Sequence, residues 1–143
     1  MKRRRLAIHP FYGVLTLVYL ACIFWLSSQS DIAILENGPI GDTAANLAHI
    51  PLYAGLAWCW RRALSPADSR SWWPAAFTLL GCGVYAVLDE FHQSFVPGRD
   101  ASIGDVGRDV IGIAAMLLFL QMRSMPAVRA VTASRNSRTG LTE

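Results

Sequence analysis

The chain has 143 residues, of which 53% are hydrophobic and only 16% are charged, whereas soluble domains carry about 25% charged residues. Its length suits one domain. The net charge is +3, and the basic residues cluster at positions 2–5 and are sparse along the tail, without interleaved aromatic residues, so we do not expect the chain to bind nucleic acid. The composition argues against a soluble protein and predicts an integral membrane protein whose main partner is lipid.

Four apolar runs predict four transmembrane helices, because a helix satisfies its own backbone hydrogen bonds in lipid. These runs cover residues 6–26, 43–60, 72–90 and 103–122. For the first run a cleaved signal peptide is the alternative, although its apolar stretch exceeds the usual core of roughly 7–15 residues. The predicted fold is therefore all-α, a four-transmembrane-helix bundle within residues 1–124. A basic cytoplasmic tail at 125–143 is predicted to be disordered.

Basic residues predict the orientation of this bundle. Eleven of the 13 Lys and Arg residues fall on the side that holds the N-terminus, the second loop and the tail, and only Arg99 and Arg108 fall on the other side. Cytoplasmic loops are enriched in Lys and Arg, so both termini are predicted to be cytoplasmic. Eight of the ten acidic residues lie on or near the predicted outer side.

Polar residues gather where the third predicted helix ends. Asp89, His92 and Gln93 are spaced i, i+3, i+4 and share one helical face. The pair at 97–98 is Pro-Gly, which breaks the helix and turns the chain. Arg99 follows at once and is expected to reach back toward the carboxylates.

The start of the fourth helix is also charged. Asp105 and Asp109 are spaced i, i+4, with Arg108 beside them, and an Asp in the first turn is favoured by the helix dipole. Ser102 is predicted to cap this helix. Small residues that we expect to admit a close neighbouring helix are Gly104, Gly107 and Gly112.

A third polar stripe lies on the second helix, where Asn46, His49 and Tyr53 are spaced i, i+3, i+7 and Pro51 interrupts the helix. The predicted topology places all three stripes at one depth beneath the outer face. The resulting candidate site contains His49, Tyr53, Asp89, Glu90, His92, Gln93, Arg99, Asp105, Arg108 and Asp109.

Other interpretations stay open for parts of this site. The charged residues could form an ion-pair network that only fixes helix packing, and Glu90 could face water without a role. No HExxH or similar ligand spacing is present, so no metal and no cofactor are predicted. Three cysteines within apolar runs are interpreted as core residues, without a disulfide framework: Cys22, Cys59 and Cys82.

With these residues in view, the chain resembles the VanZ-like family of bacterial membrane proteins from about residue 44 to 112. The resemblance is carried by His49 with Tyr53 (HxxxY), by Asp89-Glu90-x-x-Gln93-x-Phe95-x-Pro97-Gly98-Arg99, and by Asp105 with Gly112. The family often has Lys three residues before the His and Phe after it, where this chain has Asn46 and Ile50. The resemblance implies a multi-pass protein of the bacterial plasma membrane. The family is named after a member linked to low-level resistance to the glycopeptide teicoplanin, but a general cell-envelope role is the wider expectation.

Three functions fit these observations. In the first, the outward polar pocket binds or helps to modify an anionic envelope component, such as a lipid-linked precursor or a peptidoglycan stem end, through Arg99 and Arg108. In the second, the protein is an intramembrane enzyme that uses Asp89 or Asp105 as a base and His92 as its proton partner. In the third, it is a non-catalytic structural or partner subunit, and a homo-oligomer is compatible with each.

Overall fold

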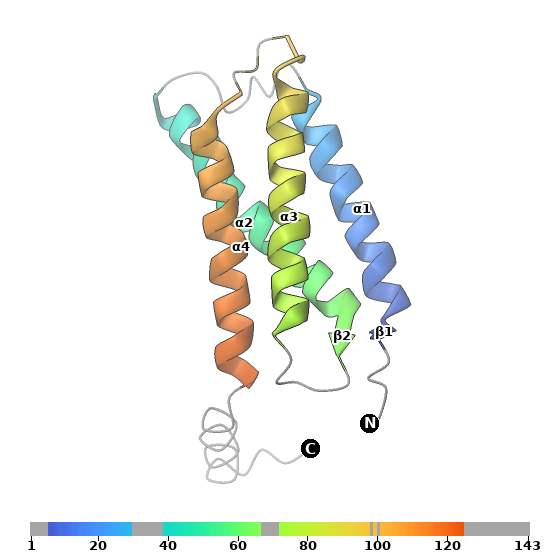
Figure 1. The fold of residues 1–143 in the computed structure, drawn as a ribbon. Coiled ribbons are helices and arrows are strands. Elements are labelled where there is room, and N and C mark those ends of the chain that lie inside the picture. The colour runs from blue at the N-terminus through green and yellow to red at the C-terminus, as the bar shows by residue number, and fades with distance from the viewer. Residues whose placement is uncertain (1–5, 30–38, 67–71, 98, 100, 125–143) are drawn as a thin grey trace, which may run out of the picture.

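The fold is a bundle of four helices with one short strand pair (Figure 1). The computed structural model describes residues 6–29, 39–66, 72–97, 99 and 101–124. The elements in chain order are β1 (Leu6–Ile8), α1 (Pro10–Ser27), α2 (Pro39–Ala63), β2 (Leu64–Pro66), α3 (Trp73–Gln93) and α4 (Ile103–Ser124).

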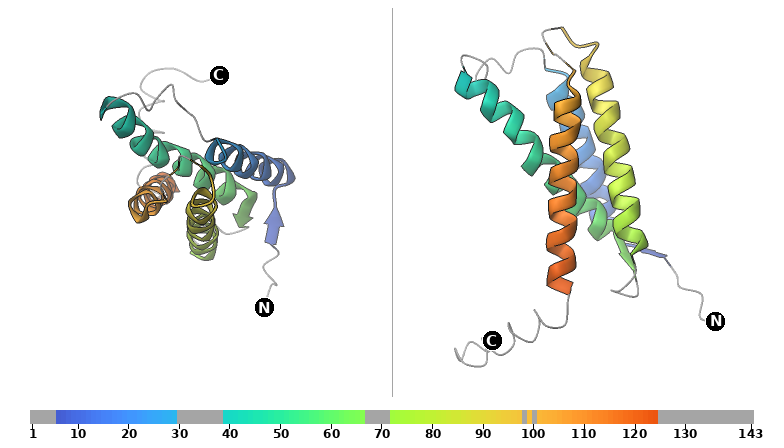
Figure 2. Two further views of the ribbon diagram at one scale, coloured as in Figure 1. Left: turned by 90° about the horizontal axis from the view of Figure 1, so that it is seen from above. Right: turned by 60° about the vertical axis from the view of Figure 1, so that its left-hand side comes forward.

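Three of the helices run roughly along the bundle, and α2 crosses them obliquely (Figure 2). The start of α1, the end of α4 and strand β2 lie at one end of the molecule, while the end of α3 and the start of α4 lie at the other. We call the latter the polar end, because the candidate site residues of α3 and α4 lie there.

The first helix begins later than predicted. Residues 6–8 form β1 and pair antiparallel with β2, with Leu6 opposite Pro66 and Ile8 opposite Leu64. His9 is extended, with φ −81° and ψ 107°, and Pro10 opens α1. A proline disfavours helical geometry in the residue before it and is itself suited to a first helical turn. The apolar run therefore crosses a helix boundary that hydropathy alone does not mark.

The other helices extend past the predicted apolar runs. Helix α2 starts four residues before position 43, continues through Pro51 and ends beyond Arg61 and Arg62, whose positive charges favour a helix C-terminus. Helix α3 reaches Gln93 and α4 reaches Ser124. The predicted disordered tail at 125–143 lies outside the described residues.

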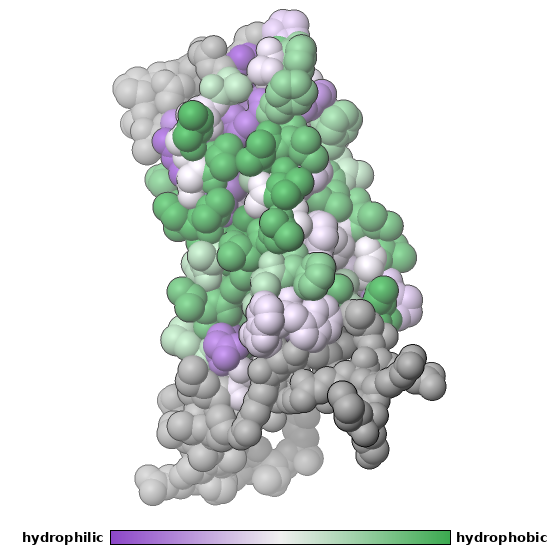
Figure 3. Space-filling view, viewed as in Figure 1, coloured by the Kyte–Doolittle hydropathy of each residue, from purple (hydrophilic) through white to green (hydrophobic). Residues whose placement is uncertain are grey.

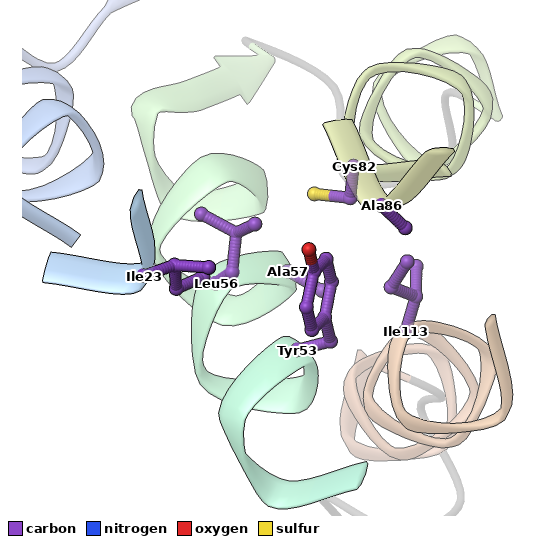
Figure 4. Close-up of a cluster of buried hydrophobic side chains, with 7 residues drawn as sticks. All are labelled: Ile23, Tyr53, Leu56, Ala57, Cys82, Ala86 and Ile113. Carbon is purple, nitrogen blue, oxygen red and sulfur yellow. The ribbon is translucent and has the colours of Figure 1, made fainter. Parts of the chain in front are cut away.

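All four helices contribute to a small core (Figure 4). Its buried members are Ile23, Tyr53, Leu56, Ala57, Cys82, Ala86 and Ile113. Several of these side chains are small, which lets the helices pack closely. Cys59 and Cys82 are buried as expected, whereas Cys22 is exposed on α1 and is not a core residue.

Large apolar side chains cover the outside of the bundle. Figure 3 shows hydrophobic residues over the middle of the molecule and hydrophilic ones near the polar end. On α1 and α3, Leu17 is 66% exposed and Leu80 is 65% exposed. Water-soluble monomers rarely expose so extensive an apolar surface. Within the described part of the chain, α1 and α3 are long and apolar enough to cross a membrane.

A glycine sets the contact between α2 and α4. A Cβ atom built on Gly112 would clash with the backbone carbonyl of Ile50 in α2. A Cβ atom built on Gly107 would have no other atom within 4 Å, and one built on Gly104 would lie nearest to the side chains of Ser102 and Arg108. The expected close approach thus occurs at Gly112. The prediction is wrong for Gly104 and Gly107, where no neighbouring helix among the described residues supplies the nearest atoms.

Candidate functional site

A largely buried histidine–carboxylate contact joins α2 to α4 at the polar end. His49 Nδ1 lies 3.0 Å from Asp109 Oδ1, and the two side chains are 18% and 0% exposed. An ionised carboxylate can only accept a hydrogen bond, so in this pair Nδ1 carries the proton. A neutral His49 then has a lone pair on Nε2, the ring nitrogen that points away from Asp109. The second Asp109 oxygen, Oδ2, is buried without a hydrogen-bond partner among the described residues.

A second buried carboxylate, Asp89, lies between α3 and α2. Its Oδ2 accepts a hydrogen bond from Gln93 Nε2 at 3.2 Å and a longer contact from the Tyr53 hydroxyl at 3.5 Å. The latter exceeds the usual length of an O–H···O bond and is therefore weak. Ser27 of α1 lies beside the same carboxylate. Ser27, Tyr53, Asp89 and Gln93 are all buried. They therefore separate the site from solvent on the side where α1 packs.

Glu90 links the end of α3 to the start of α4. It is 6% exposed, and its Oε2 accepts a hydrogen bond from the Ser102 backbone N–H at 2.8 Å. The Ser102 hydroxyl in turn accepts the Gly104 backbone N–H at 3.1 Å, so the predicted cap on α4 is confirmed. These bonds satisfy amide groups that the first turn of a helix leaves unpaired. A water-facing Glu90 is therefore wrong, because the α4 N-terminus covers it.

Asp105 and Arg108 form a salt bridge within the first turns of α4. The Asp105 side chain is 12% exposed, whereas the Arg108 side chain is 33% exposed. The carboxylate therefore points into the bundle and the guanidinium lies at its rim.

The three predicted polar stripes meet at this end of the bundle. A ring nitrogen of His49 in α2, a carboxylate oxygen of Glu90 in α3 and one of Asp105 in α4 lie within 4.8 Å of one another. The structure brings together eight of the ten predicted residues: His49, Tyr53, Asp89, Glu90, Gln93, Asp105, Arg108 and Asp109. The spacing of ligands along the chain could not show the compact His–carboxylate group, since each member comes from a different helix.

Among the described residues Arg99 makes no contact with Asp89 or Glu90, so the prediction that it reaches back to these carboxylates is wrong. Its Nε donates to the Gln29 carbonyl at 3.0 Å and its Nη2 donates to the Leu26 carbonyl at 3.2 Å. These carbonyls belong to the C-terminal end of α1, where unpaired acceptors and the helix dipole attract a cation. The side chain therefore binds across the top of α1 instead of turning inward.

His92 also faces α1. Its Nε2 lies 3.0 Å from the Ser28 hydroxyl, and its ring lies 4.5 Å from the Phe24 ring, centroid to centroid. It shares a helix with Asp89 and Gln93 but makes no hydrogen bond to Asp89 among the described residues. The contacts of His92 depend on where α1 packs against α3, so the helical spacing within α3 could not predict them.

The sequence matches a known protein family. The family model described as VanZ/LLP1 matches residues 1–124. The chain belongs to the VanZ/LLP1 family. No match was found among curated proteins or among solved structures.

The structure gives physical roles to the residues of the VanZ-like pattern. His49 and Tyr53, one helical turn apart, bind two different carboxylates, Asp109 and Asp89. Pro97 occupies the second position of a turn that the Arg99 N–H closes on the Val96 carbonyl at 3.2 Å. Together with the family, the apolar exterior identifies a membrane protein.

Proposed function

We propose that this VanZ/LLP1 protein spans the plasma membrane of a bacterial cell four times, with both termini in the cytoplasm. Its polar end then faces outward and binds, or helps to modify, an anionic component of the cell envelope. The distribution of Lys and Arg along the chain supports this orientation. The start of α1 and the end of α4 lie at the same end of the bundle, as an even number of crossings requires.

The convergence of charged side chains from α2, α3 and α4 at one end carries this proposal. Asp89, Glu90, Asp105 and Asp109 are all buried in a bundle whose exterior is apolar. Ionisable side chains at membrane depth are costly and usually mark a functional site. Mutual pairing alone does not account for them, because Asp89, Glu90 and Asp109 each keep an unpaired carboxylate oxygen within the described structure.

Arg108 is the best-placed residue to contact an anion. Its side chain is one-third exposed, and its bond to Asp105 uses only Nη1, so further N–H donors can bind a phosphate or carboxylate oxygen. Arg99 is a poorer candidate, because two of its nitrogens already bind α1 carbonyls. If the anion belongs to a peptidoglycan precursor, the same contact would connect the protein to glycopeptide resistance.

Binding of a polyprenyl phosphate to purified protein in detergent tests this role. We expect Arg108→Gln to weaken binding about tenfold, which corresponds to roughly 1.5 kcal/mol for a charge-assisted hydrogen bond. The control is Arg123→Gln, which removes an exposed arginine at the other end of the same helix. Equal affinities for both variants and the unchanged protein would contradict the proposal.

A second candidate is an intramembrane enzyme, which the His49–Asp109 pair favours. A histidine oriented by a buried carboxylate is a common acid–base device. This pair replaces the predicted partnership of His92 with Asp89 or Asp105. Turnover of a lipid phosphate that disappears in His49→Gln, with retained folding, would support the enzyme. Absence of turnover across polyprenyl phosphates and pyrophosphates would contradict it.

A further inference from the structure

The compact group of His49, Glu90 and Asp105 has the composition of a metal site. Its donor atoms lie within 4.8 Å of one another, and each residue comes from a different helix. Glu90 is 6% exposed and Asp105 is 8% exposed. A site assembled from three packed helices is held in place by the fold, as a specific metal site requires.

The side chains around this group carry a net negative charge, which a bound cation would compensate. With His49 neutral, the four carboxylates of Asp89, Glu90, Asp105 and Asp109 and the one guanidinium of Arg108 carry a formal charge of −3. Uncompensated charges are expensive in a low-dielectric interior unless they are protonated or paired. A divalent cation among the carboxylates would remove most of this excess.

One oxygen of Glu90 is available as a ligand. The Ser102 N–H holds Oε2 at 2.8 Å, whereas Oε1 is buried without a hydrogen-bond partner among the described residues. Buried carboxylate oxygens normally have a partner, so Oε1 is a candidate ligand atom. Glu90 is more than nine-tenths buried, and its carboxylate belongs to the group of donor atoms around His49.

The His49–Asp109 pair supplies the second feature of a metal site. Histidine ligands commonly donate their other ring N–H to a carboxylate, which fixes the tautomer and the orientation of the ring. Here Asp109 Oδ1 lies 3.0 Å from Nδ1. In a neutral His49 the remaining lone pair is on Nε2, which is the nitrogen that would bind the cation.

We propose that His49, Glu90 and Asp105 bind one divalent transition-metal cation of the zinc or manganese class, with Asp109 as the positioning residue for His49. A ring nitrogen among the ligands favours these metals over Mg²⁺ and Ca²⁺, which prefer oxygen ligands. Ligand atoms about 2.1 Å from a tetrahedral Zn²⁺ lie roughly 3.4 Å apart, so donor atoms that lie within 4.8 Å of one another would move closer by up to about 1.4 Å on binding. Arg108, which pairs with Asp105, would lie beside the ion.

Three protein ligands leave at least one coordination position open. An oxygen of a phosphate or carboxylate could fill it, with Arg108 binding a second oxygen of the same group. This role for the open position rests on the proposed function, whereas the metal site itself does not.

The test measures Zn²⁺, Mn²⁺ and Mg²⁺ binding to the full chain, purified in detergent without a polyhistidine tag. Equilibrium dialysis with elemental analysis is expected to give one Zn²⁺ or Mn²⁺ per chain. Glu90→Gln and Asp105→Asn keep the side-chain volume and should each weaken binding at least tenfold. His92→Gln is the matched control for His49→Gln, because His92 binds Ser28 on the other side of α3, and it should bind metal as the unchanged protein does.

Two results would overturn the inference. The first is a metal content below 0.1 per chain at saturating (~1 mM) ion for the unchanged protein. The second is equal affinity in His49→Gln and His92→Gln. A metal-induced rise in the melting temperature of the unchanged protein, reversed by a chelator, keeps the test decisive if a ligand variant fails to fold. Failure of metal binding with intact polyprenyl phosphate binding would contradict the metal site alone, and the opposite result would contradict the proposed function alone.

Discussion

At the scale of single residues, Arg99 shows how a charged side chain near a site can serve the fold instead. Its guanidinium holds two carbonyls at the end of α1 and so anchors the loop after α3 to a helix far away in sequence. We expect Arg99→Gln to lower the free energy of unfolding by about 1–2 kcal/mol, since hydrogen bonds to charged groups are worth more than neutral ones.

Thermal unfolding in detergent checks this prediction, with Arg123→Gln as the matched control. The melting temperature of Arg99→Gln should fall while its Zn²⁺ or Mn²⁺ affinity stays the same. A loss of metal or polyprenyl phosphate binding at an unchanged melting temperature would instead place Arg99 in the site.

Asp109 provides a second test at this scale. Its carboxylate is fully buried and orients His49, so Asp109→Asn should weaken metal binding roughly 10–100-fold, as loss of a supporting carboxylate does at other metal sites. Isothermal titration with Zn²⁺ and Mn²⁺ would measure the change. An affinity equal to that of the unchanged protein would show that Asp109 only packs against the ring.

At the scale of elements, the contact between α2 and α4 depends on Gly112. The added methyl group of Gly112→Ala meets the Ile50 carbonyl, whereas that of Gly107→Ala meets open space. We expect Gly112→Ala to destabilise the protein by roughly 1–3 kcal/mol, the usual cost of overpacking, and to lower its abundance in membranes. Gly107→Ala is the control on the same helix. Its melting temperature should stay the same or rise, because alanine is favoured over glycine in a helix interior by roughly 0.5–1 kcal/mol.

The sequence predicts the number of helices but not all of their boundaries. Four apolar runs predict the four helices, because hydropathy reports long continuous burial in lipid or core. They do not locate Pro10, where backbone geometry starts α1, or the extension of α2 past Arg61 and Arg62, where polar residues continue a helix. The β1–β2 pair was missed because strands of three residues carry no periodicity.

At the scale of the whole molecule, the site was predictable where the topology alone determines it. The end of α3 and the start of α4 are joined by a short loop, so Asp89, Glu90 and Asp105 must lie close together. The direction of His92 and Arg99 was not predictable, because it depends on where α1 packs. The grouping of His49 with two carboxylates likewise depends on the oblique path of α2 (Figure 2).

We propose that the bundle is embedded in the membrane with its polar end facing outward, and single-cysteine labelling distinguishes this orientation from the reverse one. After replacement of Cys22, Cys59 and Cys82 by alanine, Ser94→Cys and Ser124→Cys would report on opposite ends of the bundle. We predict that a membrane-impermeant maleimide labels Ser94→Cys in intact cells and labels Ser124→Cys only after the membrane is permeabilised. The reverse pattern, or labelling of both positions in intact cells, would show that the proposed orientation in the membrane is wrong.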